Sequence, residues 1–192
     1  MAYLLSLDAS STVVGYSIWD KDTKELIKMD YLKLEKGSLL EKADEFELLL
    51  NRLRGLYPQI DEMVIEEAMM AMFGGMSSAH TTTMLNQMNI LYQYVCRKNG
   101  LTTSTITVQS CRKSAFPTVK LRPKKLSGGL THKEQIFNVV VEKLGKDRFP
   151  TKVLQSGKNK GNTVFLDEAK DMADSYVVGL GYLNKLKNEN KA

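Results

Sequence analysis

Four acidic residues stand in or beside apolar segments, and they constrain the fold of this chain more than any other feature: Asp8, Glu66, Asp171 and Asp174. The first two each end a short apolar run that predicts a strand. The last two are three residues apart near the start of a helix predicted over 166–185, so they lie on one side of it. Residues 175–183 of that helix carry no charge, which indicates that it is buried. A carboxylate is costly in such surroundings.

Each of these acids also has a structural explanation. An aspartate at the end of a strand can cap a turn, and acids in the first turns of a helix are favoured by the helix dipole. Together, four carboxylates without a supporting histidine or cysteine form a set of hard oxygen ligands, which suits Mg²⁺ or Mn²⁺ and not zinc. Without cations the set would repel itself and its pKa values would rise.

Two-metal hydrolysis is the chemistry that such a set supports. Two divalent ions about 4 Å apart bracket a phosphodiester, one lowering the pKa of the attacking water and the other stabilising the leaving 3′ oxygen. A carboxylate cluster of this kind therefore favours a phosphodiester hydrolase.

The order of the predicted elements indicates a mixed α/β sheet with helices packed on it. Strands come first and then alternate with helices. The predicted strands are 3–8, 13–19, 24–34, 63–65 and 105–108, and the predicted helices are 38–54, 77–98, 131–144 and 166–185. Ser38 and Thr131 are the expected N-caps, the latter in a capping box with Glu134. We expect one domain over 1–187 and a flexible tail over 188–192.

Residues 68–96 contain no Asp, Glu, Lys or Arg, and seven of the ten methionines lie between Met63 and Met88. A helix that is hydrophobic over most of its circumference is buried. The segment can be core, or it can be a subunit interface, because so long an uncharged helix is hard to cover in a small protein. We expect a homodimer that uses it.

Positive charge is concentrated in one part of the chain. The net charge is +5, but residues 112–160 hold 13 basic and 3 acidic residues. Such a segment is either a solvated surface or the binding site of a polyanion, and nucleic acid is the partner we expect. We expect 112–125 to be irregular and 146–161 to be a loop. The predicted DNA contacts are Arg112, Lys113, Lys120, Arg122, Lys124, Lys125 and Lys133, and Lys158 and Lys160 extend this set.

Several classes of protein are excluded by simpler features. No run of about 18 apolar residues exists, so no transmembrane helix is predicted, and the first residues do not resemble a signal peptide. The two cysteines, Cys96 and Cys111, form no CxxC motif, which excludes a zinc ribbon or a disulfide scaffold and fits a reducing compartment. We expect a cytoplasmic protein.

Three blocks of the sequence resemble, in the same order and spacing, the RuvC Holliday-junction resolvases. Residues 7–16, which read LDASSTVVGY, resemble the opening of that family. Residues 64–67, which read VIEE and are followed by Met72, resemble its second acidic strand, and residues 171–175, DMADS, resemble its C-terminal helix. The first block also resembles the phosphate loop of actin-like kinases, but those proteins need a second domain that 192 residues cannot supply.

The resemblance implies an RNase H-like fold, a homodimer, and an endonuclease that nicks four-way DNA junctions during DNA recombination and repair. It implies two Mg²⁺ or Mn²⁺ ions in each active site, with the same four acids as catalytic residues and metal ligands. It also places Arg112, Lys113 and Lys133 near the family's basic residues at the scissile region.

The chain departs from the family in three places. Ala9-Ser10 stand where the bacterial proteins commonly have Pro-Gly. The aromatic that supports opening of the junction centre is replaced by Met69 and Met70, with Phe73 nearby. The segments 120–129 and 146–161 are longer and more basic than expected. These departures indicate a divergent member, compatible with a phage protein that acts in the host cytoplasm.

The sequence leaves three functions open. The first is a dimeric, metal-dependent resolvase of four-way junctions. The second is a broader nuclease of the same fold that also cuts Y-forks and flaps. The third is a branched-DNA binding module that does not cleave, against which the four retained acids argue.

Overall fold

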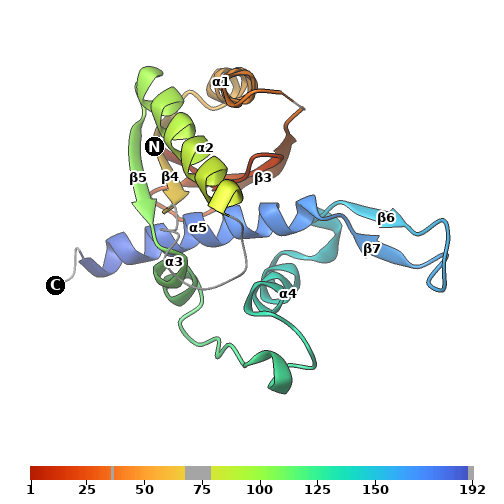
Figure 1. The fold of residues 1–192 in the computed structure, drawn as a ribbon. Coiled ribbons are helices and arrows are strands. Elements are labelled where there is room, and N and C mark those ends of the chain that lie inside the picture. The colour runs from red at the N-terminus through yellow and green to blue at the C-terminus, as the bar shows by residue number, and fades with distance from the viewer. Residues whose placement is uncertain (36, 68–78, 190–192) are drawn as a thin grey trace.

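The computed structural model describes residues 1–35, 37–67 and 79–189, and it contains a five-stranded mixed sheet in the order β3-β2-β1-β4-β5 (Figure 1). The pairs β1–β2 and β2–β3 are antiparallel, whereas β1–β4 and β4–β5 are parallel. The strands are β1 Tyr3–Ala9, β2 Val13–Asp20, β3 Leu26–Lys33, β4 Ile60–Glu66 and β5 Thr102–Ile106. The helices are α1 Leu39–Leu56, α2 Ala79–Lys98, α3 Val108–Ala115, α4 His132–Leu144 and α5 Glu168–Glu189.

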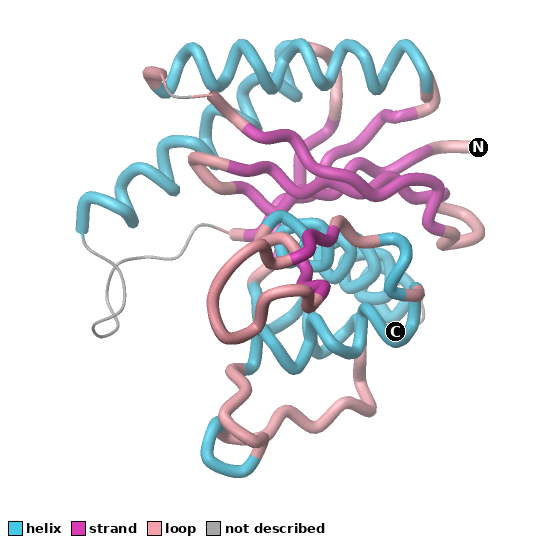
Figure 2. Tube along the Cα trace, turned by 90° about the vertical axis from the view of Figure 1, so that its right-hand side faces the viewer, coloured by secondary structure: helices cyan, strands magenta, loops and turns pink. Residues whose placement is uncertain are grey.

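Helices cover both faces of the sheet, as the predicted α/β architecture requires (Figures 1 and 2). One core joins α1 and α2 to one face, and a second core joins α3, α4 and α5 to the other. Successive side chains of β1 point to opposite faces of the sheet, so they alternate between the two cores. Leu5 and Leu7 belong to the core with α1 and α2, whereas Leu4 and Ser6 contact the α5 side. Asp8 follows the same alternation and faces α5.

Helix α5 lies very close to the sheet because small residues line the contact. A Cβ atom at Gly15 would be 2.0 Å from the backbone oxygen of Asp171, and one at Gly179 would be 2.2 Å from Nε1 of Trp19. The hydroxyls of Ser6 and Ser17 donate hydrogen bonds to the backbone oxygen of Ser175, at 3.0 and 3.1 Å. The close contacts at the glycines set the distance between α5 and the sheet, and the hydrogen bonds to Ser175 set its position along the strands.

The local signals for helix starts are confirmed. Ser38 caps α1 and Thr131 caps α4, and each forms a capping box with the glutamate three residues later. Two capping boxes satisfy backbone N–H groups that would otherwise lack partners at these ends. The capping box of α4 thereby fixes the start of that helix, and with it the positions of His132 and Lys133.

Two expectations about the basic segments were wrong. The segment 112–125 is not irregular throughout, because residues 108–115 form α3, a short helix that packs on α5. The segment 146–161 is not a simple loop. It contains a short 3₁₀ helix, Lys146–Arg148, and strand β6, Thr151–Val153, which pairs with β7, Thr163–Phe165, in a hairpin that projects from the body (Figure 1). Another 3₁₀ helix, Lys124–Leu126, lies between α3 and α4.

Helix α2 is buried on one side only, so the core alternative holds for that side and the other side is left uncovered within one chain. Met88, Tyr92 and Cys96 are fully buried against the sheet and α1. Ile90 and Tyr94, one turn apart on the other side, are 65% and 62% exposed. The exposed side of α2 is uncharged and partly apolar over 80–96, and it ends in the exposed basic residues Arg97 and Lys98. None of the helices in the described ranges has the length and apolar character needed to cross a membrane.

We predict that Gly15→Ala destabilises the protein and that Gly55→Ala does not. The new methyl group at position 15 would force α5 away from β2, at a cost of about 1–3 kcal/mol. At Gly55, in the last turn of α1, a Cβ would meet no atom within 4 Å, and alanine favours a helix by up to about 1 kcal/mol. Urea unfolding measures both effects, and an unchanged midpoint for Gly15→Ala would contradict the close contact.

Candidate active site

Two of the four acids lie at the carboxyl ends of neighbouring parallel strands. Leu7 of β1 pairs with Ile65 of β4, so Asp8 and Glu66 follow at the same level of the sheet. Because alternate residues of a strand share a face, both side chains lie on the face that α5 covers. The two strands therefore present two carboxylates side by side beneath the start of α5.

Helix α5 adds the other two acids at the same place. Gly15 pairs with Asp8 across β1 and β2, and the backbone of Asp171 lies directly against Gly15. Asp174 is one helical turn further along, and its side chain is only 13% exposed. The structure thus brings all four sequence-predicted acids to one end of the sheet, from three different elements.

The closeness of these carboxylates is visible in their pKa values. Burial raises the pKa of Asp8 well above its usual range, and the negative charges of the other three acids raise it further, Asp174 most of all. Burial and then the charge of Asp174 raise the pKa of Glu66 to about 7. Burial also raises the pKa of Asp171, against which the positive charge of Lys133 acts.

Lys133 provides positive charge inside this cluster. Its Nζ lies 2.6 Å from a carboxylate oxygen of Asp174 and 3.9 Å from one of Asp171. Burial alone would lower the pKa of Lys133, but the charges of Asp174 and Asp8 outweigh that effect and raise it. Lys133 is the second residue of α4, where the helix dipole disfavours a cation. Its pairing with the acids accounts for a lysine at that position.

Arg112 approaches the cluster from α3. Its positive charge acts against the rise in the pKa of Glu66. Helix α3 can lie this close because Gly181 of α5 leaves room for it: a Cβ on Gly181 would be 2.4 Å from the backbone oxygen of Cys111. The residue that follows Cys111 is Arg112, so the same contact sets its position.

The donor atoms of the cluster are carboxylate oxygens, which fit hard divalent cations. In the described ranges, no three acidic, histidine or cysteine side chains converge closely enough to hold an ion as they stand. The ammonium of Lys133 instead supplies the cationic charge between two of the acids. Asp8, Glu66, Asp171 and Asp174 are the residues that would hold metal ions after a rearrangement of these side chains.

The remaining predicted DNA contacts lie outside the carboxylate cluster. Lys113 is exposed on α3, and the other four are exposed on the segment between α3 and α4: Lys120, Arg122, Lys124 and Lys125. The side chain of Gln135 on α4 bonds both backbone groups of Arg122, with distances of 2.9 and 2.8 Å, which ties this segment to α4. Lys158 and Lys160 are exposed in the connection between β6 and β7. The predicted junction-centre residues Met69, Met70 and Phe73 lie outside the described residues.

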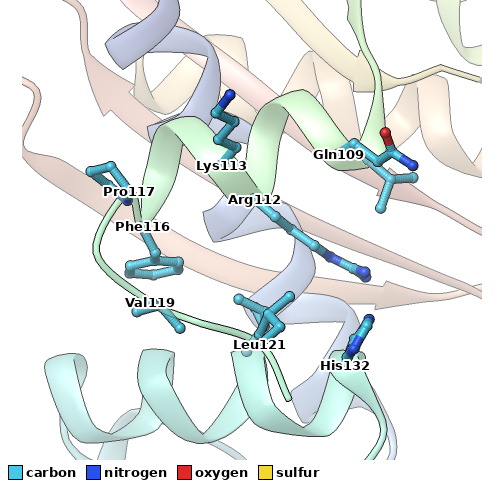
Figure 3. A pocket seen from close by; sticks show the side chains of 10 residues that line it. Gln109, Arg112, Lys113, Phe116, Pro117, Val119, Leu121 and His132 are labelled. Carbon is cyan, nitrogen blue, oxygen red and sulfur yellow. The ribbon is translucent and has the colours of Figure 1, made fainter. Parts of the chain in front are cut away.

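A pocket of about 320 Å³, lined in part by Arg112, lies between α3, the segment that follows it and the start of α4 (Figure 3). Sequence reasoning missed Gln109 and His132, which line it together with Arg112. For His132, the sequence did contain a signal of a role at the site, because this residue lies between the expected N-cap Thr131 and the predicted DNA contact Lys133.

Comparison with known proteins identifies the fold. No protein-family model matches the sequence, and no curated protein matches it either. Among solved structures, the chain is similar to T. thermophilus RuvC in complex with a Holliday-junction substrate, with a TM-score of 0.62 and 10% identity, over 98% of this chain and 96% of that one. It is also similar to the yeast mitochondrial Holliday junction resolvase Ydc2, with a TM-score of 0.56 and 12% identity, over 99% and 82% of the two chains. The chain therefore has a RuvC-like, RNase H-like fold, as its three sequence blocks predicted.

We predict that Glu66→Gln stabilises the metal-free protein near neutral pH. The folded-state pKa of Glu66 is raised from 4.5 to about 7, so the folded state binds more protons than the unfolded state between these values. The contribution of Glu66 to stability is present at low pH and is lost as pH rises through this window. At about pH 8 the neutral glutamine removes that penalty, which is at most roughly 3 kcal/mol at about 1.4 kcal/mol per pKa unit.

Thermal unfolding in EDTA at about pH 5 and about pH 8 measures this effect. Glu142→Gln, an exposed change on α4 that also removes one negative charge, is the matched control and should be close to neutral. A higher Tm for Glu66→Gln at about pH 8 and a smaller gain at about pH 5 are expected. Equal Tm values for wild type and Glu66→Gln at both pH values would contradict the repulsion within the cluster.

Proposed function

We propose that this protein is a metal-dependent endonuclease that resolves four-way DNA junctions by paired nicks. The observation that carries the proposal is the meeting of four carboxylates at the carboxyl ends of β1 and β4 under α5, in a RuvC-like fold. Clustered carboxylates of raised pKa are costly to the fold. A functional requirement is the physical reason to retain them.

The four acids would hold two Mg²⁺ or Mn²⁺ ions. Such ions, when bound, supply an activated water and stabilise the charge on the leaving 3′ oxygen. The chain's own residues bind and orient the substrate. Lys133 lies among the acids and Arg112 approaches them from α3, and their positive charges would attract the phosphate that approaches the cluster.

Support for DNA as the substrate comes from the distribution of charge. The exposed basic residues between α3 and α4 and those of the β6–β7 hairpin belong to the same half of the chain as Lys133 and Arg112. Phosphate contacts of this kind position a duplex without reading its sequence. We therefore propose selectivity for branch shape above base sequence, and binding that weakens as salt is raised.

A homodimer is part of the proposal, because two nicks placed symmetrically across a junction need two active sites related by a two-fold axis. The exposed side of α2 that carries Ile90 and Tyr94 is the proposed interface, and Arg97 and Lys98 border it at the end of the helix. Met88, from the same uncharged segment, is fully buried inside one chain and so belongs to its core.

We expect cleavage to require divalent metal and each of the four acids. Asp8→Asn, Glu66→Gln, Asp171→Asn and Asp174→Asn each remove a ligand charge, and each should lower the rate of cleavage at least about 100-fold while DNA binding persists or tightens. The assay uses an end-labelled four-way junction, a Y-fork and a linear duplex, with Mg²⁺, Mn²⁺ or EDTA. Glu142→Gln is the control acid and should cleave normally.

The outcomes separate the functions. Paired cuts confined to the four-way junction support the resolvase, and equal cutting of the Y-fork supports the broader branched-DNA nuclease. Binding without cleavage under any metal would leave only a binding module. Full activity in EDTA, or in Asp8→Asn, would contradict metal-dependent chemistry at these acids.

A further prediction concerns assembly. Ile90→Glu and Tyr94→Glu should convert a dimer into monomers, because each buries a charge in the proposed interface while leaving the core untouched. Leu48→Glu, a similar change at a 71% exposed position on α1, is the control and should remain dimeric. Light scattering at micromolar concentration gives the mass, and a wild-type mass of a single chain would refute the dimer.

A further inference from the structure

The pocket beside the acids has an apolar floor and a polar rim. Apolar side chains from α3, the following segment and α4 form the floor: Phe116, Val119, Leu121 and Ile136. Gln109, Arg112 and His132 stand at its edge, and in Figure 3 the side chain of Arg112 extends toward His132. A concave site with apolar side chains and a few polar groups is typical of a binding site for a small organic group.

The elements that form this pocket also form the carboxylate cluster. On α4, His132 lines the pocket and the next residue, Lys133, pairs with Asp174. On α3, Arg112 lines the pocket and its charge acts on Glu66. The pocket therefore lies on the side of the cluster from which Arg112 and Lys133 approach the acids.

This placement constrains what the pocket can bind. A nucleic-acid strand whose phosphate lies at the acids has its neighbouring nucleotide within reach of the pocket. A base has a flat apolar face and polar edges, which match the floor with Phe116 and the rim with Gln109, Arg112 and His132. The cationic rim also complements the adjoining phosphates. A base reaches such a pocket only when it is unpaired and unstacked.

We propose that this pocket takes one unpaired base of the DNA strand that lies across the carboxylates. The proposal rests on the proposed nuclease function and adds a specific contact to it: the enzyme engages a nucleotide that has left the stack next to the scissile phosphate. Such bases are available where strands exchange at a junction and absent from an intact duplex. The pocket thereby contributes to selection of branched DNA by a contact that needs no particular sequence around it.

The test replaces single nucleotides near the crossover of a four-way junction with an abasic residue, one position at a time. Binding is measured in EDTA, so that no strand is cut. For the wild type, one position or two adjacent positions should show a loss of affinity of about 5- to 150-fold, since stacking of a base on an aromatic side chain contributes about 1–3 kcal/mol. Leu121→Trp fills the pocket and should abolish this position dependence.

Two controls keep the result interpretable. Leu126→Trp makes the same change five residues later at a 70% exposed position outside the pocket, and it should keep the wild-type pattern. If Leu121→Trp yields no folded protein, as judged by thermal unfolding, Val119→Trp fills the pocket from the adjoining wall.

A flat abasic scan in the wild type, or a pattern unchanged in the pocket-filling variant, would overturn the proposal. The same junctions are then incubated with Mg²⁺. Normal cleavage with a flat scan rejects the base pocket alone and leaves the nuclease intact. Absence of both binding and cleavage rejects the nuclease function and the pocket with it.

Discussion

The backbone of α5 rests on β2 at Gly15, and the arrangement of the site depends on that contact. A side chain at this position would collide with the backbone of Asp171. Only glycine therefore allows α5 to approach the sheet closely enough to lie beside Asp8. The Ser175 carbonyl, bound by Ser6 and Ser17, prevents α5 from sliding along the sheet. On its other side, Gly181 admits α3 and with it Arg112. The packing of α5 therefore determines the positions of the carboxylates, of Arg112 and of the pocket that Arg112 lines.

The consequence is an electrostatic conflict inside the protein. Helix packing forces acids from β1, β4 and α5 into one partly buried place, and the pKa values of Asp8 and Glu66 rise as a result. Lys133 offsets part of the repulsion by pairing with Asp174 and Asp171. The packing of α5 stabilises the fold while the cluster that it creates destabilises it. A cluster of this kind is expected where cations or phosphates bind, because binding relieves the repulsion.

Local chemistry in the sequence predicted a large part of this fold. The antiparallel start of the sheet, the caps at Ser38 and Thr131 and the acids at strand ends all depend on neighbours in the chain. Helix α3 was missed although Thr107 caps it and the buried residues Cys111 and Ala115 lie on one side of it, because a pattern over only eight residues is a weak signal. The pairing of Lys133 with Asp174 joins residues far apart in the chain and leaves no local signal. The sequence left open whether the uncharged segment is core or interface, because the absence of charge does not distinguish a buried side of a helix from an exposed one.

A crystal structure of the protein with Mn²⁺, in which anomalous scattering locates the metal, tests the central claim most directly. The account predicts metal peaks among Asp8, Glu66, Asp171 and Asp174, with Lys133 displaced from Asp174. It also predicts that α5 stays in place, because the Gly15 and Ser175 contacts are independent of the metal. A map at saturating Mn²⁺ without a peak among these carboxylates, with Lys133 still paired to Asp174, would contradict it.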